Sequence, residues 1–265
     1  MVVCLEFEML KRTCGIVLKN AVFGEADLIV TYLTSQHGLL KTFAKSPRKI
    51  KSRFGSSLEP LTYARISFFG KEEAGLPRLT QSDIIRPFDS LRSDFNSLLD
   101  ISEILELCLN FLPEREPAPD VFKLLLNMMM TLESHTACKL LYLFYKIKFL
   151  QIAGYLPGLS ACGKCGAKTS MVQQARHNYH HFYLDQGTVI CSRCLTGESG
   201  SMPGGRLVSS GSLRFYEGLL KWNPSAIGRI NASGTLVAEL ADVIDEHIRY
   251  VLGPSRISRF KTGSQ

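Results

Sequence analysis

The first 84 residues alternate short runs of β-branched, aromatic and leucine residues with turn signals. Turn pairs such as Phe23-Gly24 and Ser46-Pro47 separate these runs. The runs predict five strands, over residues 15–18, 28–34, 39–44, 61–69 and 76–82. Five short strands at irregular spacing are typical of a small barrel of the OB type. The sequence therefore predicts a five-stranded OB-fold barrel, as an N-terminal nucleic-acid-binding domain over residues 1–84.

From residue 89 the period of the apolar positions changes to three- and four-residue steps, which indicates helices. The first predicted helix begins at Asp89, with Asp89 or Ser90 as its cap, and ends before Pro113. Further helices are predicted over residues 120–134, 137–153, 212–222 and 235–252, the last ending at Gly253. The fold class is therefore α+β, with a helical body in two parts, over residues 85–154 and 201–265, the second carrying a basic tail.

Two C-x-x-C pairs lie between the two parts of the helical body, in a module predicted over residues 155–200. Their members are Cys162, Cys165, Cys191 and Cys194. Two thiolate pairs at this spacing complete the tetrahedron that Zn²⁺ prefers, and Gly163 and Gly166 would relieve the turns of the binding loops. Two disulfides, or four unrelated buried thiols, are the alternatives. Four protein ligands leave no open coordination position, so we expect one structural zinc ion and no catalytic metal.

The other cysteines and the histidines of the module are not expected to bind the metal. Cys4, Cys14, Cys108 and Cys138 have no regular spacing and are expected to be ordinary small apolar residues. Between the cysteine pairs, residues 179–184 and 188–190 predict a hairpin. The histidines of this stretch are expected at the surface or behind the ligands, because four cysteines already fill the coordination shell; they are His177, His180 and His181.

The formal net charge is +7, with a pI of about 9.0, and the positive charge is clustered. A first cluster without any acid consists of Lys41, Lys45, Arg48, Lys49, Lys51 and Arg53, and a second of Arg249, Arg256, Arg259 and Lys261. Basic clusters suit a polyanion, because each cation that meets a phosphate releases a counterion. A solvated surface is the alternative for either cluster. Phe43 and Phe54 could stack on bases, although the core is the better expectation for Phe43.

Several classes of protein are disfavoured by what the sequence lacks. It contains no G-x-x-x-x-G-K-[ST] loop, no H-E-x-x-H, no G-x-S-x-G, and no H-x-E beside a C-x-x-C pair. The N-terminal residues carry Glu6, Glu8, Lys11 and Arg12, and no window holds eighteen uninterrupted apolar residues. These features disfavour a P-loop ATPase and a zinc deaminase, and they predict a cytoplasmic protein.

Several segments together resemble the bacterial RecO family of recombination mediators. The similar segments are FGEADLIV at 23–30, GL at 38–39 with AKSPRKIKSRFG at 44–55, LEP at 58–60, LTQS at 79–82, and residues 252–260 with ISRF at their end. The resemblance spans the chain, and the segment around 44–60 is its most specific part. Pro47 and Ile257 depart from the family pattern, and the departure at Pro47 bears on the shape of the basic loop but not on its charge.

The resemblance implies a non-enzymatic mediator of DNA repair and recombination associated with the nucleoid. It implies binding to single- and double-stranded DNA and annealing of complementary strands. With RecR, such a protein helps load RecA onto DNA coated with single-strand-binding protein. The acidic C-terminal tail of single-strand-binding protein is a further implied partner, and Arg249, Arg256 and Arg259 are the expected place for it.

Two other classes remain open. A zinc-containing nuclease or modifying enzyme would require a carboxylate cluster or an open metal site, and the sequence suggests neither. An RNA-binding protein with an OB barrel and a zinc ribbon is compatible with the composition, since single-strand grooves accept either sugar.

Overall fold

The computed structural model describes residues 10–47, 54–70, 75–134, 139–169, 179–196, 205–227, 230 and 232–253. The chain divides into two compact units, Met1–Thr136 and Ala137–Gln265, and each is described by itself. No helix within these described ranges is both long enough and apolar enough to cross a bilayer.

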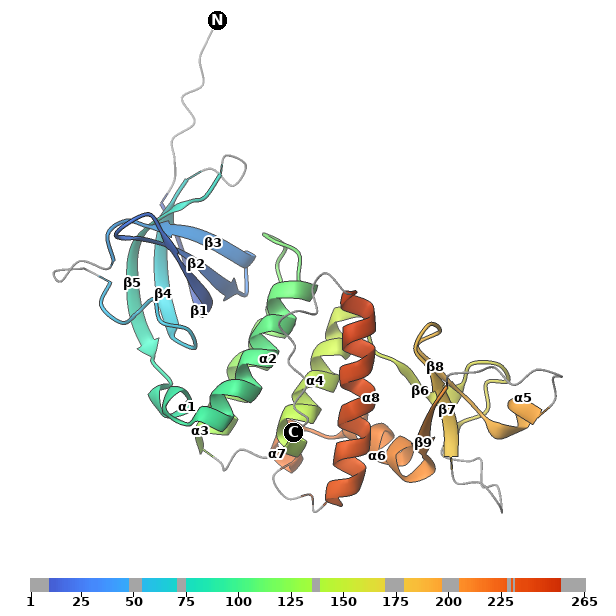
Figure 1. Cartoon of the computed structure of the whole chain (residues 1–265). Coiled ribbons are helices and arrows are strands. Elements are labelled where there is room, and N and C mark those ends of the chain that lie inside the picture. Colours follow the sequence, from blue (N-terminus) through green and yellow to red (C-terminus); the bar gives the residue numbers. More distant parts are fainter. Residues whose placement is uncertain are drawn as a thin grey trace, which may run out of the picture. The chain divides into compact units, whose positions relative to one another are not determined.

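The first unit contains a closed barrel of five strands, in the order β1-β2-β3-β5-β4 (Figure 1). The strands are β1 (Lys11–Phe23), β2 (Asp27–Thr34), β3 (Gly38–Ala44), β4 (Tyr63–Phe69) and β5 (Arg78–Arg86). The predicted OB-type barrel is therefore confirmed. Strand β1 is longer than the predicted 15–18, because its pairing with β2 continues past the core as far as Phe23 opposite Asp27.

Alternation along the strands decides which side chains fill the barrel. Val30 and Tyr32 on β2 and Leu40 on β3 point inward and are buried, so their neighbours in sequence face outward. Phe54, in the loop after β3, joins this core and is 3% exposed, which excludes it as a stacking residue. Phe43, by contrast, is only half-buried, and the expectation that it lies in the core is wrong.

One end of the β2–β3 pair is covered by the segment around residue 115. The Arg115 N–H donates to the Leu39 carbonyl over 3.0 Å, and Glu114 forms isolated β-bridges with Gly38 and Leu39. A Cβ atom on Gly38 would lie 1.7 Å from the Glu116 carbonyl oxygen, and its φ is +53°. Only glycine therefore allows this close approach of the two backbones.

The helices of the first unit are α1 (Asp89–Ser93), α2 (Phe95–Phe111) and α3 (Pro119–Ser134). The single helix predicted from Asp89 is therefore two helices. Asp94 separates them, because its backbone is extended and its carboxylate accepts the Ser97 N–H over 2.9 Å, which caps α2. The cap position of α1 is Phe88, so the prediction of Asp89 or Ser90 as the cap was wrong.

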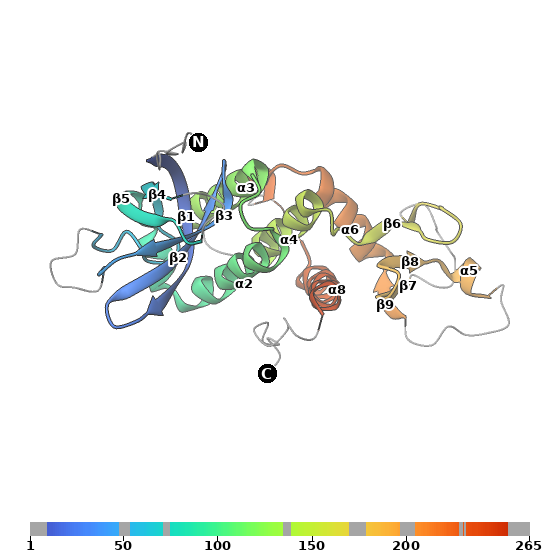
Figure 2. The same cartoon turned by 90° about the horizontal axis from the view of Figure 1, so that it is seen from above.

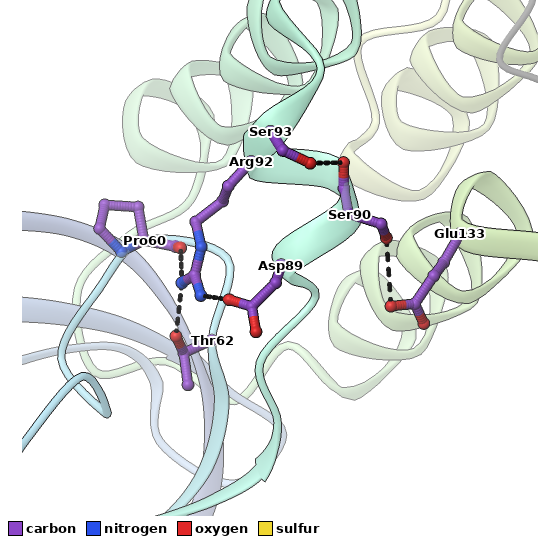
Figure 3. Close-up of polar contacts among 7 residues, drawn as sticks. All are labelled: Pro60, Thr62, Asp89, Ser90, Arg92, Ser93 and Glu133. Atoms are coloured by element: carbon purple, nitrogen blue, oxygen red, sulfur yellow. Dashed lines mark hydrogen bonds and ion pairs between the residues drawn. The ribbon is translucent and has the colours of Figure 1, made fainter.

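Helix α1 links the barrel to α3 (Figure 3). Arg92 donates to the Pro60 carbonyl over 3.2 Å and to the Thr62 hydroxyl over 3.1 Å, and it pairs with Asp89 in its own helix. Ser90 donates to Glu133 of α3 over 3.3 Å. These contacts join the barrel and the helices of the first unit.

The second unit combines helices with a four-stranded sheet of order β6-β8-β7-β9. Its strands are β6 (Gly158–Cys162), β7 (Tyr179–Tyr183), β8 (Thr188–Ile190) and β9 (Arg206–Ser209). Its helices are α4 (Lys139–Ala153), α5 (Ser192–Thr196), α6 (Ser210–Lys221), α7 (Pro224–Ile227) and α8 (Gly234–Leu252). Helix α4 contacts α6 and α8, and Figure 2 shows α8 almost end-on beside α4. The predicted hairpin is confirmed as β7–β8, whereas β6 and β9 had no counterpart in the sequence pattern.

Polar contacts join the sheet to α8. Arg206 on β9 forms ion pairs with Asp242 and Glu246, both at 2.9 Å. Lys146 of α4, which is buried, pairs with Asp245 at 2.8 Å. Asp242, Asp245 and Glu246 of α8 therefore each have a basic partner.

Candidate metal centre and nucleic-acid interface

The four predicted metal ligands come together at one end of the sheet in the second unit. The Sγ atoms of Cys162, Cys165, Cys191 and Cys194 all lie within 4.8 Å of one another. Cys162 ends β6, Cys191 follows β8, and Cys194 lies in α5, so the parallel pairing of β6 with β8 brings the two C-x-x-C segments side by side. Within the described ranges, no other group of three or more such ligands gathers.

The spacing between the sulfur atoms fits a tetrahedral ion better than a disulfide. The Cys165 and Cys191 sulfurs are 3.8 Å apart, and all four thiols are free. A tetrahedron with Zn–S bonds of about 2.3 Å has edges of about 3.8 Å, whereas a disulfide requires about 2.05 Å. The cluster can therefore hold one metal ion.

The local backbone explains how each pair reaches the centre. After Cys162 the chain turns back, with the Gly166 N–H donating to the Cys162 carbonyl over 2.9 Å and Gly166 at φ +70°. A Cβ on Gly163 would lie 2.5 Å from the Thr188 methyl carbon, so this position also favours glycine. The second pair has no glycine, because Cys191 instead opens a helical turn to Cys194, whose N–H donates to the Cys191 carbonyl over 3.0 Å.

The surroundings of Cys162 favour its thiolate form, which is the form that binds metal. Burial raises the pKa of this thiol, but the N–H groups of Cys191, Cys165 and Lys164 outweigh burial and lower the pKa to about 6. The neighbouring cysteines act in the opposite direction on Cys194 and raise its pKa to about 12. Without a cation, four thiolates in this space would repel one another.

Of the histidines near the cysteines, the two that the structure describes, His180 and His181, do not join the cluster. His180 is 2% exposed. Burial lowers its pKa, and the charge of His181 lowers it further. It therefore lies in the interior rather than at the surface. His177 lies outside the described residues.

The predicted DNA-binding residues fall into two groups. Lys41 lies on β3 and forms an ion pair with Glu114, and Lys45 is exposed just after β3. The remaining four, Arg48, Lys49, Lys51 and Arg53, lie outside the described residues. Lys41 is thus not a free cation, because its partner is an acid 73 residues later in the sequence.

The structure adds an aromatic pair to this region. Phe23, at the end of β1, is 53% exposed and packs edge-to-face against Phe43 on β3, with 5.9 Å between ring centres. The sequence had suggested only a turn at Phe23-Gly24. A phenylalanine directly before the glycine of a predicted turn was the available signal.

Of the predicted partner-binding residues, only Arg249 is described. It lies in the last turn of α8, half-buried, and its Nε donates to the Asp245 carbonyl over 3.2 Å. Arg256 and Arg259, like Lys261, lie outside the described residues.

Comparison with known proteins assigns the family. The sequence model described as Recombination protein O N terminal matches residues 9–88, and the model described as Recombination protein O C terminal matches residues 92–259. The chain belongs to the RecO family. The first match covers the barrel, and the second covers helices α2 to α8 and the cysteine cluster of this RecO-family chain.

Similar RecO proteins come from several bacteria. The DNA repair protein RecO of Thermodesulfovibrio yellowstonii is 42% identical over 91% of this chain and 93% of its own length. The protein of the same name from Dehalococcoides mccartyi strain CBDB1 is 31% identical over 91% of this chain and 90% of its own length. That from Bacillus pumilus is 26% identical over 90% of this chain and 88% of its own length.

Proposed function

We propose that this chain is a DNA-repair protein that binds single- and double-stranded DNA and anneals complementary strands without catalysing a chemical step. With RecR, it would help load RecA onto DNA coated with single-strand-binding protein. Membership of a family whose relatives are named DNA repair protein RecO supports the repair role. The observation that carries the DNA-binding role is the closed OB-type barrel with a basic segment leaving β3.

Annealing requires cations that offset the repulsion between two phosphate backbones. In this proposal, Lys45, Arg48, Lys49, Lys51 and Arg53 contact phosphates, and Lys41 joins them when Glu114 releases it. If about six phosphates are neutralised, the log–log slope of single-strand affinity against salt is about −4.

A charge-reversal variant tests this assignment. We expect Lys45, Arg48, Lys49 and Arg53 changed together to Glu to abolish both strand binding and annealing, measured by fluorescence with complementary oligonucleotides. A matched variant reverses four exposed cations elsewhere, Lys123, Lys139, Arg214 and Lys221, and so changes the net charge equally. Strand binding should survive in that control, and circular dichroism should show both variants folded. Retained DNA binding in the first variant would refute the assignment.

The four-cysteine cluster would hold one structural Zn²⁺ ion, with Cys162, Cys165, Cys191 and Cys194 as its ligands. The donor set supports zinc because four soft thiolates at tetrahedral spacing match its preference. When bound, the ion would cross-link β6 to the segment after β8 and offset the repulsion between the thiolates. A full set of protein ligands leaves no position for a substrate.

For the tail of single-strand-binding protein, we propose the basic end of the chain, Arg249, Arg256 and Arg259. Cations beside apolar helix faces suit a peptide that is acidic and apolar. Changing Arg256 and Arg259 to Ala should weaken binding of a tail peptide in fluorescence polarisation. An unchanged affinity would remove this location.

A further inference from the structure

One outer face of the barrel carries a defined set of side chains from three adjacent strands. In the strand register, Lys19 on β1 lies opposite Thr31 on β2, which lies opposite Lys41 on β3. Two residues further along, the row consists of Ala21, Ile29 and Phe43, and the next row begins with Phe23 opposite Asp27. Residues that lie directly opposite each other point to the same side of a sheet.

This face is covered at one end and open at the other. At the covered end, Leu33 and Leu39 are 0% and 3% exposed, and the backbone of the segment around Glu114 pairs with that of Leu39. At the open end, Phe23 is 53% exposed and Ala21 is also exposed. The open end is therefore a small aromatic surface with lysines beside it.

The two rings at the open end contact each other. Phe43 packs with its ring at 87° to that of Phe23, and the 53% exposure of Phe23 leaves part of its ring accessible to a ligand. Asp27, opposite Phe23, accepts the Ser46 N–H over 2.6 Å. This contact places Lys45 and the start of the basic segment beside the β1–β2 turn.

We propose that Phe23, supported by Phe43, is a stacking platform for an unpaired base of a bound single strand. The inference rests on the proposed DNA-binding function and adds a contact to bases, whereas the basic segment contacts phosphates. Stacking on an aromatic ring needs a base with a free face, which a strand within a duplex does not offer. The platform therefore makes this barrel select single-stranded over fully paired DNA.

The charges around the platform favour a polyanion over a second copy of this chain. Lys19 and Lys45 flank the two rings, and Lys41, which is paired with Glu114, lies in the neighbouring row. In a symmetric dimer through this face the same lysines would meet one another, and like charges in contact are unfavourable. A strand brings phosphates to the lysines and a base to the ring at the same time.

Binding of the full chain to a short labelled oligothymidylate tests the platform. Phe23→Ala should weaken the affinity by roughly 5- to 150-fold, the range for losing one stacked base. The log–log salt slope should not change, because no phosphate contact is lost. Phe95→Ala is the matched control, since Phe95 is 70% exposed on α2 and outside this face, and it should bind as the parent does.

A strand with abasic sites throughout separates stacking from other contacts. The parent and Phe23→Ala should bind this strand with the same affinity as each other. The two proteins should also have the same affinity as each other for a blunt duplex. Phe23→Trp should retain affinity, and its added indole fluorescence should be quenched by oligothymidylate but not by the abasic strand.

Three results would overturn the inference. The first is an affinity of Phe23→Ala for oligothymidylate equal to that of the parent. The second is a loss of affinity in Phe23→Ala that is as large on the abasic strand as on oligothymidylate. The third is a parent chain that sediments as a dimer while Phe23→Ala sediments as a monomer. If the parent chain binds no strand at all, the proposed function fails and the platform with it. If the parent chain binds the strand and Phe23→Ala binds it with the same affinity, the stacking platform is wrong but the proposed function stands.

Discussion

A single acidic residue determines how strongly one predicted DNA contact can act. Glu114 approaches β3 through the backbone contacts of its segment with Gly38 and Leu39, and its carboxylate pairs with Lys41. Both side chains are about half exposed, so the pair contributes little to stability. In the proposed function, the pair instead places a negative charge where a phosphate would meet Lys41.

Replacing Glu114 by Gln should therefore strengthen binding to single strands. We expect an increase of about two- to tenfold at low salt, and a salt slope steeper by about 0.7 if Lys41 gains one phosphate. Fluorescence anisotropy over a salt series measures both quantities. Asp120→Asn is the control, because Asp120 is an exposed acid paired with Lys123 on α3. Equal affinity of Glu114→Gln and the parent chain would mean that Glu114 does not restrict Lys41.

Phe43 and Phe54 show what sequence reasoning reaches at the residue scale. Both lie in a basic stretch, and their surroundings in the sequence are similar. The barrel buries Phe54 among Val30, Leu40 and Leu58 and leaves Phe43 on the outer face beside Phe23. Exposure depends on the side of the barrel to which each position points, and the local sequence did not reveal that side.

At the scale of elements, β9 is attached to α8 by a cluster of hydrogen bonds around Glu239. Its carboxylate accepts the Ser209 N–H and hydroxyl, both over 2.7 Å, and the Ser212 hydroxyl over 2.5 Å. Burial raises the pKa of Glu239, but these hydrogen bonds and the charge of Arg206 outweigh burial and lower the pKa. The ionised carboxylate therefore holds the strand, the start of α6 and α8 together.

Glu239→Gln should reduce stability in a pH-dependent way. A lowered pKa in the folded state means that the carboxylate stabilises the fold above its unfolded pKa of about 4.3. This stabilisation is lost as the pH falls through the folded value. We expect the free energy of unfolding to fall by about 1–3 kcal/mol at neutral pH, because hydrogen bonds to a charged group are lost. In acid, where the carboxylate of the parent chain is protonated, the difference between the two chains should be smaller. Urea unfolding at several pH values measures it, and a pH-independent difference would contradict this account.

The helices show which element boundaries a sequence can specify. The stop at Gly253 was predicted correctly, because glycine at φ +72° is a common helix end. The break at Asp94 was missed, although Asp94 is itself a good capping residue. The apolar period continues through Asp94 from Leu91 to Leu98, so the pattern alone gave no reason to divide the helix.

At the scale of the whole molecule, the cysteine cluster and the barrel belong to different compact units. The cluster joins two segments of the second unit that are distant in sequence, after β6 and after β8. Among the described residues, the core beside it includes Tyr183, Ile190 and Leu195 together with Cys162, Cys191 and Cys194. A bound ion would therefore contribute much of the local stability.

Removing the metal should loosen the sheet around the cluster and leave the barrel unchanged. With a strong chelator, we expect hydrogen exchange to accelerate in β6, β8 and α5, and to stay slow in the core of β2. Elemental analysis should give one zinc per chain before treatment, and added Zn²⁺ should restore protection. Unchanged exchange after verified zinc removal would show that the ion does not stabilise this sheet.

The sequence by itself predicted the five barrel strands, most of the helices and the four cysteines that cluster, because strand alternation, helix ends and C-x-x-C spacing are local patterns. It also indicated the family, through segments that lie along the whole chain. Only the tertiary structure decided that Lys41 pairs with Glu114, that Phe23 and Phe43 share an open face, and that β6 and β9 complete the second sheet. Each of these joins residues far apart in sequence, and such contacts depend on how strands pair in space rather than on the pattern within any one strand.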